Sequence, residues 1–172
     1  MNIFFLHIDP DQCAEMHVDK HVVKMITESV QILCTVHHVC GSVDKDFKIP
    51  YKITHKNHPS CIWTRESLSN YIYLTKLAMS LCKEYTYRYN KIHKGEQYIE
   101  QLMKNLPNIE DIGFTIPRQA MPDMYKYEND DITFEHVIES YQSYYFFEKQ
   151  HILKWKNRPI PEFITELENM SV

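Results

Sequence analysis

Hydrophobic residues recur every three or four positions over most of this chain, which is the spacing of amphipathic helices. Aspartates precede the first such segment and Gly41 follows it, as at the two ends of many helices. Pro59 suits the first position of a second helix, and Pro107 ends a third. The pattern predicts helices over residues 11–39, 59–90, 95–106 and 133–156.

The remaining segments have no helical period. Residues 1–9 are largely apolar and are expected to form a short buried strand or extended segment that ends at a proline. Residues 41–58 are irregular, and residues 107–131 contain three prolines; a loop of that length is often functional. An acidic tail follows the last predicted helix. We therefore predict a mainly α fold, a single compact helical domain over residues 1–172 with a short N-terminal extended segment and a long proline-containing loop.

Composition agrees with a globular helical protein. Of the 172 residues, 44% are hydrophobic and 24% are charged. The three glycines form neither of the glycine-rich phosphate-binding motifs, G-x-x-x-x-G-K and G-x-G-x-x-G. Five cysteines, an odd number without a C-x-x-C pair, argue against a disulfide framework and favour a cytoplasmic location. The apolar start is short and lacks basic residues, so we expect neither a signal peptide nor a membrane span.

Charge is distributed unevenly along the chain. The net charge is −4, yet residues 45–94 hold ten Lys/Arg and only three Asp/Glu. A basic segment within an acidic protein can present a phosphate-binding face, because local potential governs the docking of polyanions. Alternatively, the basic and acidic parts neutralise each other in the fold. The expected partner is DNA or a nucleotide ligand, and no membrane partner is expected.

The stretch HVDKHVVKMITE, residues 17–28, places ionisable groups on one side of its predicted helix. At spacings i, i+4, i+7 and i+11, the stripe consists of His17, His21, Lys24 and Glu28. Such a stripe is either a solvated face or a catalytic one. An amine becomes nucleophilic where neighbouring cations or burial favour its neutral form. We therefore predict that Lys24 is an amine nucleophile, that Glu28 handles the proton, and that the two histidines assist them.

Two further segments combine cations with aromatic residues. Histidines come before a predicted helix start in residues 54–67, THKNHPSCIWTRES, and backbone N–H groups at a helix start bind anions. EYTYRYNKIHK interleaves tyrosines with cations, which suits base stacking and phosphate contact, although caps and salt bridges are ordinary alternatives. The predicted platforms for an extruded base are Trp63, Tyr85 and Tyr87. The full set of predicted phosphate- or base-binding residues is Lys20, His55, His58, Trp63, Arg65, Glu66, Asn70, Tyr85, Arg88, His93 and Lys94.

Metal binding is an alternative chemistry. His17 and His21 have the i, i+4 spacing of helical metal sites, and His55 and His58 would complete a set. Neighbouring lysines would repel a dication, and no supporting carboxylate or thiolate is evident. We expect no metal and no other cofactor, and keep a His-ligated metal-dependent enzyme as an alternative.

Several motifs resemble a group of small uncharacterised proteins of phages and large DNA viruses. They are DKHVVKM, HKNHP, W-x-R-E-S-x-x-N-Y, EYTYRY and QAMPD, and the resemblance covers nearly the whole chain. This resemblance implies that the protein is viral, and therefore that its expected cytoplasmic location is in a host cell. It implies no established activity.

The layout also resembles the pyrimidine-dimer DNA glycosylases of phage endonuclease V type, which are small helical base-excision enzymes. Residues 14–17 resemble the start of the family's His-bearing helix, and residues 58–90 resemble its long basic and aromatic helix. Residues 149–163, with the Arg158–Pro159 pair, resemble the C-terminal end of that family. The resemblance implies an all-α DNA-repair enzyme.

That family attacks the sugar with the α-amine exposed after methionine removal, next to a catalytic carboxylate. Here Asn2 is bulkier than the small residue of the family, so Met1 is expected to stay. Lys24 lies near the position of the family's catalytic carboxylate, and the nearest carboxylate of the stripe is Glu28, one turn later. The resemblance therefore leaves two candidate amines.

Together these observations predict a nucleic-acid base-processing enzyme, a hydrolase or lyase of DNA glycosylase/AP-lyase type. One alternative is an enzyme that binds the phosphate of a free nucleotide. Another is a non-enzymatic protein that sequesters a nucleotide. The sequence does not define the oligomeric state.

Overall fold

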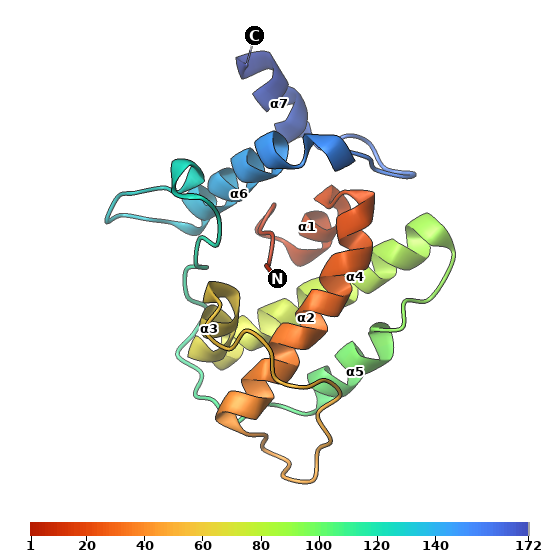
Figure 1. Ribbon diagram of the computed structural model, residues 1–172, viewed down its shortest axis with the longest axis vertical. Helices are drawn as coiled ribbons and strands as arrows, with labels where there is room; N and C mark the ends of the chain where they lie inside the picture. The colour runs from red at the N-terminus through yellow and green to blue at the C-terminus, as the bar shows by residue number, and fades with distance from the viewer. Residues whose placement is uncertain (172) are drawn as a thin grey trace.

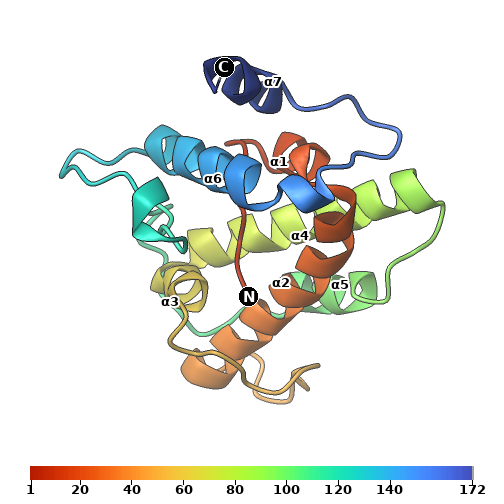
Figure 2. The same ribbon diagram turned by 45° about the horizontal axis from the view of Figure 1, so that its top comes forward.

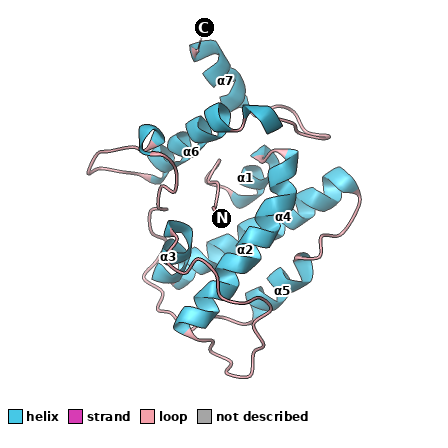
Figure 3. Ribbon diagram, in the orientation of Figure 1, coloured by secondary structure: helices cyan, strands magenta, loops and turns pink. Residues whose placement is uncertain are grey.

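The structure, a computed structural model, describes residues 1–171 and contains helices and loops (Figure 1). The α-helices are α1 Pro10–Met16, α2 Asp19–Cys40, α3 Pro59–Glu66, α4 Leu68–Tyr89, α5 Glu96–Lys104, α6 Phe134–Glu148 and α7 Glu162–Met170. Two short 3-10 helices are η1 Asp123–Tyr125 and η2 Gln150–Ile152. Figure 3 shows no strand among these residues, and none of their helices has the length and apolar character needed to cross a membrane. The predicted fold class, a mainly α single domain, is confirmed.

The N-terminal segment lies inside the molecule. Helices α2 and α4 pack against each other with α3 and α5 beside both, and α6 lies on the other side of the first residues (Figures 1 and 2). Phe4 packs against Tyr145 of α6, while Phe5 contacts Trp63 of α3. The four residues 3–6 are each at most 4% exposed. The predicted extended segment is confirmed, and it is buried by helices rather than paired as a strand.

The first long helix predicted from the sequence is in fact two helices. His17 and Val18 adopt extended conformations between α1 and α2, with ψ angles of 137° and 155°. The prediction of one continuous helix over residues 11–39 was therefore wrong at this point. As a consequence, His17 caps the end of α1 and does not continue the helical stripe of α2.

Partners from distant elements satisfy the backbone groups that this break leaves free. Arg88 on α4 donates hydrogen bonds to the carbonyls of Glu15 at 2.9 Å and His17 at 2.8 Å. The Val18 amide donates to the hydroxyl of Tyr145 at 2.9 Å. Buried backbone groups must be paired, and here tertiary contacts replace the missing helical hydrogen bonds. Hydrophobic periodicity has no means of showing such a break.

Arg88 is 2% exposed and is held by carboxylates as well as carbonyls. Its Nε donates to Glu84 at 2.7 Å, and its Nη1 donates to Asp19 at 2.9 Å. Glu84 also accepts from both Nε and Nη2 of Arg158, at 3.0 and 2.9 Å. The network therefore ties α4 to the start of α2 and to the segment after η2.

The second long helix is also interrupted. Ser67 is extended between α3 and α4, with φ of −153° and ψ of 147°. Its hydroxyl donates to Asp111 at 3.0 Å, and the Leu68 amide donates to the carbonyl of Glu110 at 3.0 Å. The proline-containing loop thus supplies the partners, and the predicted continuous helix over residues 59–90 was wrong at Ser67.

The other predicted elements differ mainly in length. Helix α5 agrees with the predicted segment 95–106 to within two residues at its C-terminal end. The last predicted helix was too long, because α6 ends at Glu148 and a 3-10 turn follows. The acidic tail contains α7, which was not predicted, and its residues Phe163 and Ile164 are buried.

We expect Arg88→Met to lower the free energy of unfolding by about 3–5 kcal/mol, because it leaves buried acceptors without their donor. Urea titration at neutral pH measures this change. Lys83→Met removes an exposed cation from the same helix and is expected to stay within about 0.5 kcal/mol of wild type. Equal stability of the two variants would contradict the role of the network.

Candidate functional site

The carboxylate of Glu28 lies between two amines. Its Oε1 is 3.4 Å from Nζ of Lys24, one turn earlier on α2. Its Oε2 is 3.6 Å from the α-amine of Met1 and accepts a hydrogen bond from the Asn2 amide at 2.9 Å. The predicted pair of Lys24 and Glu28 therefore has a third neighbour, the α-amine at the start of the N-terminal segment.

The side chain of Asn2 holds this end of the chain in place. Its Nδ2 donates to the carbonyl of Ala120 at 2.9 Å. Its Oδ1 accepts from the hydroxyls of Ser60 at 3.4 Å and Tyr141 at 3.3 Å. These partners belong to the start of α3, the long loop and α6, so three elements position the Met1 amine beside Glu28.

Access to solvent differs among the three groups. Glu28 is 7% exposed, whereas the Lys24 side chain is 65% exposed. The Met1 side chain is only 4% exposed, and the residue as a whole is partly exposed. Burial, one of the two conditions expected to activate Lys24, is not met. The Lys24 side chain is therefore open to solvent, while the carboxylate of Glu28 stays enclosed.

His58 lies at the edge of this cluster. It caps α3, with Nδ1 accepting from the Ser60 amide at 3.1 Å. Burial lowers the pKa of His58, and the positive charges of the Met1 amine and His55 lower it further. Because the His58 side chain already occupies the Ser60 amide, the predicted anion cradle at this helix start is partly filled. His55 is exposed and Arg65 donates to the carbonyl of Lys56.

The two predicted catalytic histidines of the stripe are buried. His17 donates from Nδ1 to the carbonyl of Cys13 across 2.7 Å, and burial lowers its pKa to about 4. His21 stacks on Phe4 with ring centroids 4.7 Å apart and meets Tyr145 edge-on at 5.2 Å. Burial, together with nearby cations, lowers the pKa of His21 to about 3. Both rings are therefore neutral near pH 7 and do not supply charge to the stripe.

Three predicted base- or phosphate-binding residues serve the fold instead. Trp63 is fully buried and donates to the carbonyl of Thr115 at 3.0 Å, so its ring faces the core and is no platform for a base. Asn70, also buried, donates to the Trp63 carbonyl at 2.8 Å and to the Thr115 hydroxyl at 2.7 Å. Glu66 forms a salt bridge with Arg118. These polar groups anchor the long loop to α3 and α4.

The residues predicted near the C-terminal end of α4 lie away from Met1 and the Glu28 cluster (Figures 1 and 2). Arg88 is buried in its ion network and is not available to a phosphate. Tyr85 packs against His93, whose Nδ1 accepts from the Gly95 amide at 2.9 Å. The exposed Tyr87 holds the Arg158 guanidinium 4.1 Å from its ring centre. Exposed cations remaining from the predicted set are Lys20, on α2, and Lys94, after α4. The predicted set therefore does not form one surface.

The alternative metal set is not assembled. Over residues 1–171, no group of three or more His, Cys, Asp or Glu side chains is arranged to hold a metal ion. In particular, His17 and His21 pack on Phe4, whereas His58 caps α3. His17 and His21 therefore share one buried environment, and His58 lies in another.

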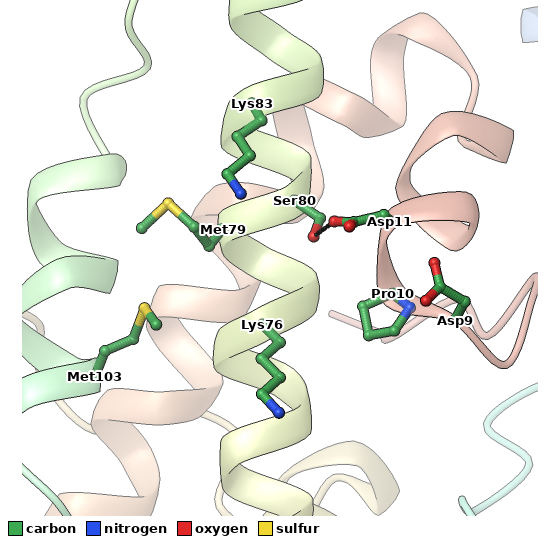
Figure 4. Close-up of a pocket in the computed structure, with 8 residues that line it drawn as sticks. All are labelled: Asp9, Pro10, Asp11, Lys76, Met79, Ser80, Lys83 and Met103. Atoms are coloured by element: carbon green, nitrogen blue, oxygen red, sulfur yellow. Dashed lines mark hydrogen bonds between the residues drawn. The ribbon is translucent and has the colours of Figure 1, made fainter.

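A separate pocket of about 400 Å³ lies between the start of α1 and the middle of α4 (Figure 4). Its lining consists of Asp9, Pro10, Asp11, Lys76, Met79, Ser80, Lys83 and Met103. Ser80 donates a hydrogen bond to Asp11, and the two lysines project from α4. None of the residues predicted from the sequence to form a site lines it.

Comparison of the chain with protein-family models, with curated proteins and with solved structures gives no match. The interpretation of the site therefore depends on its geometry.

Sequence reasoning missed the part that Asn2 and Ala120 take in positioning the amine. A signal was present, because Ala120 belongs to the QAMPD motif within a loop long enough to suggest function. The pairing itself joins residues 118 positions apart, and no local pattern indicates such a contact.

Buried histidines are expected to make the protein unstable in mild acid. Burial lowers the pKa of His37 to about 4, as it does for His17. An unfolded histidine has a pKa near ~6.5, so the unfolded state binds more protons between these values. The free energy of unfolding should therefore fall as pH drops from about 6.5 towards 4, each histidine contributing up to ~1.4 kcal/mol per pH unit.

Urea titrations at pH 7, 6 and 5 check this expectation. His37→Gln should show a shallower decline than wild type, because one titrating group is removed. An unfolding free energy that is equal at pH 7 and pH 5 would contradict the neutral, buried state of these rings.

Proposed function

We propose that the protein is a nucleic-acid base-processing enzyme of DNA glycosylase/AP-lyase type, which uses an amine beside Glu28. The observation that carries the proposal is a buried carboxylate that lies within 3.6 Å of two amines. Excision through an imine requires this combination, an amine that attacks and a carboxylate that handles protons.

The chemistry assigns a role to each group. The neutral amine bonds to C1′ of the nucleotide sugar as the bond from C1′ to the base breaks, and the base leaves with a proton. The bound amine then gives one proton to Glu28, the bond from C1′ to O4′ breaks and O4′ takes a proton, giving a protonated imine between the protein and C1′. Glu28 is close enough to both amines to accept and return these protons. Hydrolysis of the imine, or elimination of the 3′ phosphate followed by hydrolysis, releases the protein.

Two amines fit this role. Lys24 has the greater reach, because its side chain is long and exposed. The geometry favours neither by distance, since their separations from Glu28 are 3.6 and 3.4 Å.

Borohydride trapping on duplexes that carry abasic or damaged bases tests the proposal. We expect a covalent adduct with wild type and its loss in Glu28→Gln, which keeps a hydrogen-bond acceptor for the Asn2 amide but lacks the charge. Lys104→Ala is the matched control, because it removes an exposed cation from α5, which carries none of the groups around Glu28, and it is expected to leave trapping intact.

Lys24→Ala and a form with an acetylated Met1 amine then distinguish the nucleophiles. Loss of the adduct in one form alone identifies the amine, and mass spectrometry of the trapped peptide locates it. Absence of any adduct with every lesion, in a wild-type protein that is folded by circular dichroism, would remove the imine mechanism.

A further inference from the structure

The pocket over α4 is lined by charges of both signs. Lys76 and Lys83 lie one turn before and one turn after Ser80, so they project from the same face of α4 (Figure 4). Asp9 and Asp11 line the wall formed by the start of α1. The volume of about 400 Å³ lies in the range of pockets that hold small molecules. The pocket therefore combines room for a ligand with two charges of each sign.

The fold leaves these charges available to a ligand. Among residues 1–171, neither lysine of the pocket forms an ion pair with a carboxylate. Each aspartate uses only Oδ1 for the fold. Asp9 accepts from the Gln12 amide at 2.9 Å, and Asp11 accepts from the Ser80 hydroxyl. A carboxylate accepts hydrogen bonds at both oxygens, so Oδ2 of each aspartate can still receive a donor.

Apolar side chains form the rest of the lining. Figure 4 shows Met79 and Met103 on one side of α4, with the aspartates on the other. Met103 is 43% exposed, so part of its apolar surface is uncovered. Thioethers pack against apolar groups of many shapes and make favourable contacts with aromatic rings. The pocket thus has a cationic, an anionic and an apolar part.

We propose that this pocket binds a free α-amino acid with an apolar side chain, above all an aromatic one. The carboxylate of the ligand is held by Lys76 and Lys83, and its ammonium group donates to Oδ2 of Asp9 and Asp11. The side chain of the ligand covers the two methionines. Binding here involves no covalent step and is independent of the amine chemistry at Glu28.

Other classes of ligand complement the lining less well. A phosphate or nucleotide would bring further negative charge against the two aspartates, and such like-charge contacts are unfavourable. A divalent cation would face the two lysines, and over residues 1–171 no group of three or more His, Cys, Asp or Glu side chains is arranged to hold one. A ligand with one charge of each sign satisfies both walls of the pocket.

Isothermal titration calorimetry at pH 7 with L-phenylalanine measures binding. L-Phenylalaninamide lacks the carboxylate, and 3-phenylpropionate lacks the ammonium group. We expect each analogue to bind roughly fivefold more weakly than L-phenylalanine, because each leaves one pair of charges in the pocket without a partner.

Two variants, each checked for folding by circular dichroism, assign these contacts. Lys76→Met combined with Lys83→Met removes both cations and should bind L-phenylalanine no more tightly than its amide. Asp9→Asn keeps a side-chain oxygen that caps α1 but lacks the charge, so it should lessen the preference for L-phenylalanine over 3-phenylpropionate. Lys45→Met, at an exposed lysine in the loop after α2, is the matched control and should bind like wild type.

Wild-type affinity of both variants for L-phenylalanine would overturn the proposal, as would a wild-type protein that binds neither L-phenylalanine nor L-leucine. Equal affinity of wild type for L-phenylalanine and its amide would reject the free amino acid in favour of a cationic ligand such as the N-terminus of a peptide. Equal affinity for 3-phenylpropionate would reject it in favour of a simple carboxylate. None of these measurements uses DNA, so their outcome is separate from that of borohydride trapping.

Discussion

The buried guanidinium of Arg88 is the interaction on which the arrangement of the helices depends. An arginine keeps its charge in a protein, so burying it requires acceptors for its N–H groups. Two carboxylates and the carbonyls of Glu15 and His17 supply them. Those carbonyls are free only because the chain leaves the helical conformation between α1 and α2. The helix break and the buried cation therefore require each other.

This break also allows the N-terminal segment to reach the site. Because α1 and α2 are separate helices, the apolar residues before α1 lie between α2 and α6 instead of on the surface. Phe4 and Phe5 fix the segment through aromatic contacts on both sides. The Met1 amine then lies beside Glu28, and the same packing covers one face of the His21 ring. The core and the candidate site thus share their residues.

Local sequence determines only part of this arrangement. The helical class, the extended first residues and the pairing of Lys24 with Glu28 follow from spacing along the chain. The breaks at His17 and Ser67 do not, because their cause is a set of partners from distant elements. The prediction that Arg88 binds a phosphate or a base was wrong for a related reason. A cation among tyrosines suits a phosphate contact and a buried ion pair equally well, and only its 2% exposure decides between them.

Glu28 is the residue whose presence the fold explains least. A glutamine there would accept the same hydrogen bond from the Asn2 amide and would avoid placing a charge at a position that is 7% exposed. Enclosing a carboxylate costs several kcal/mol unless its partners compensate, and replacing buried ion pairs by neutral groups is often no less stable. What the carboxylate adds over the amide is a negative charge and the ability to take a proton from either neighbouring amine. Because stability alone does not require those properties, this side chain supports the proposed proton transfer at the Met1 and Lys24 amines.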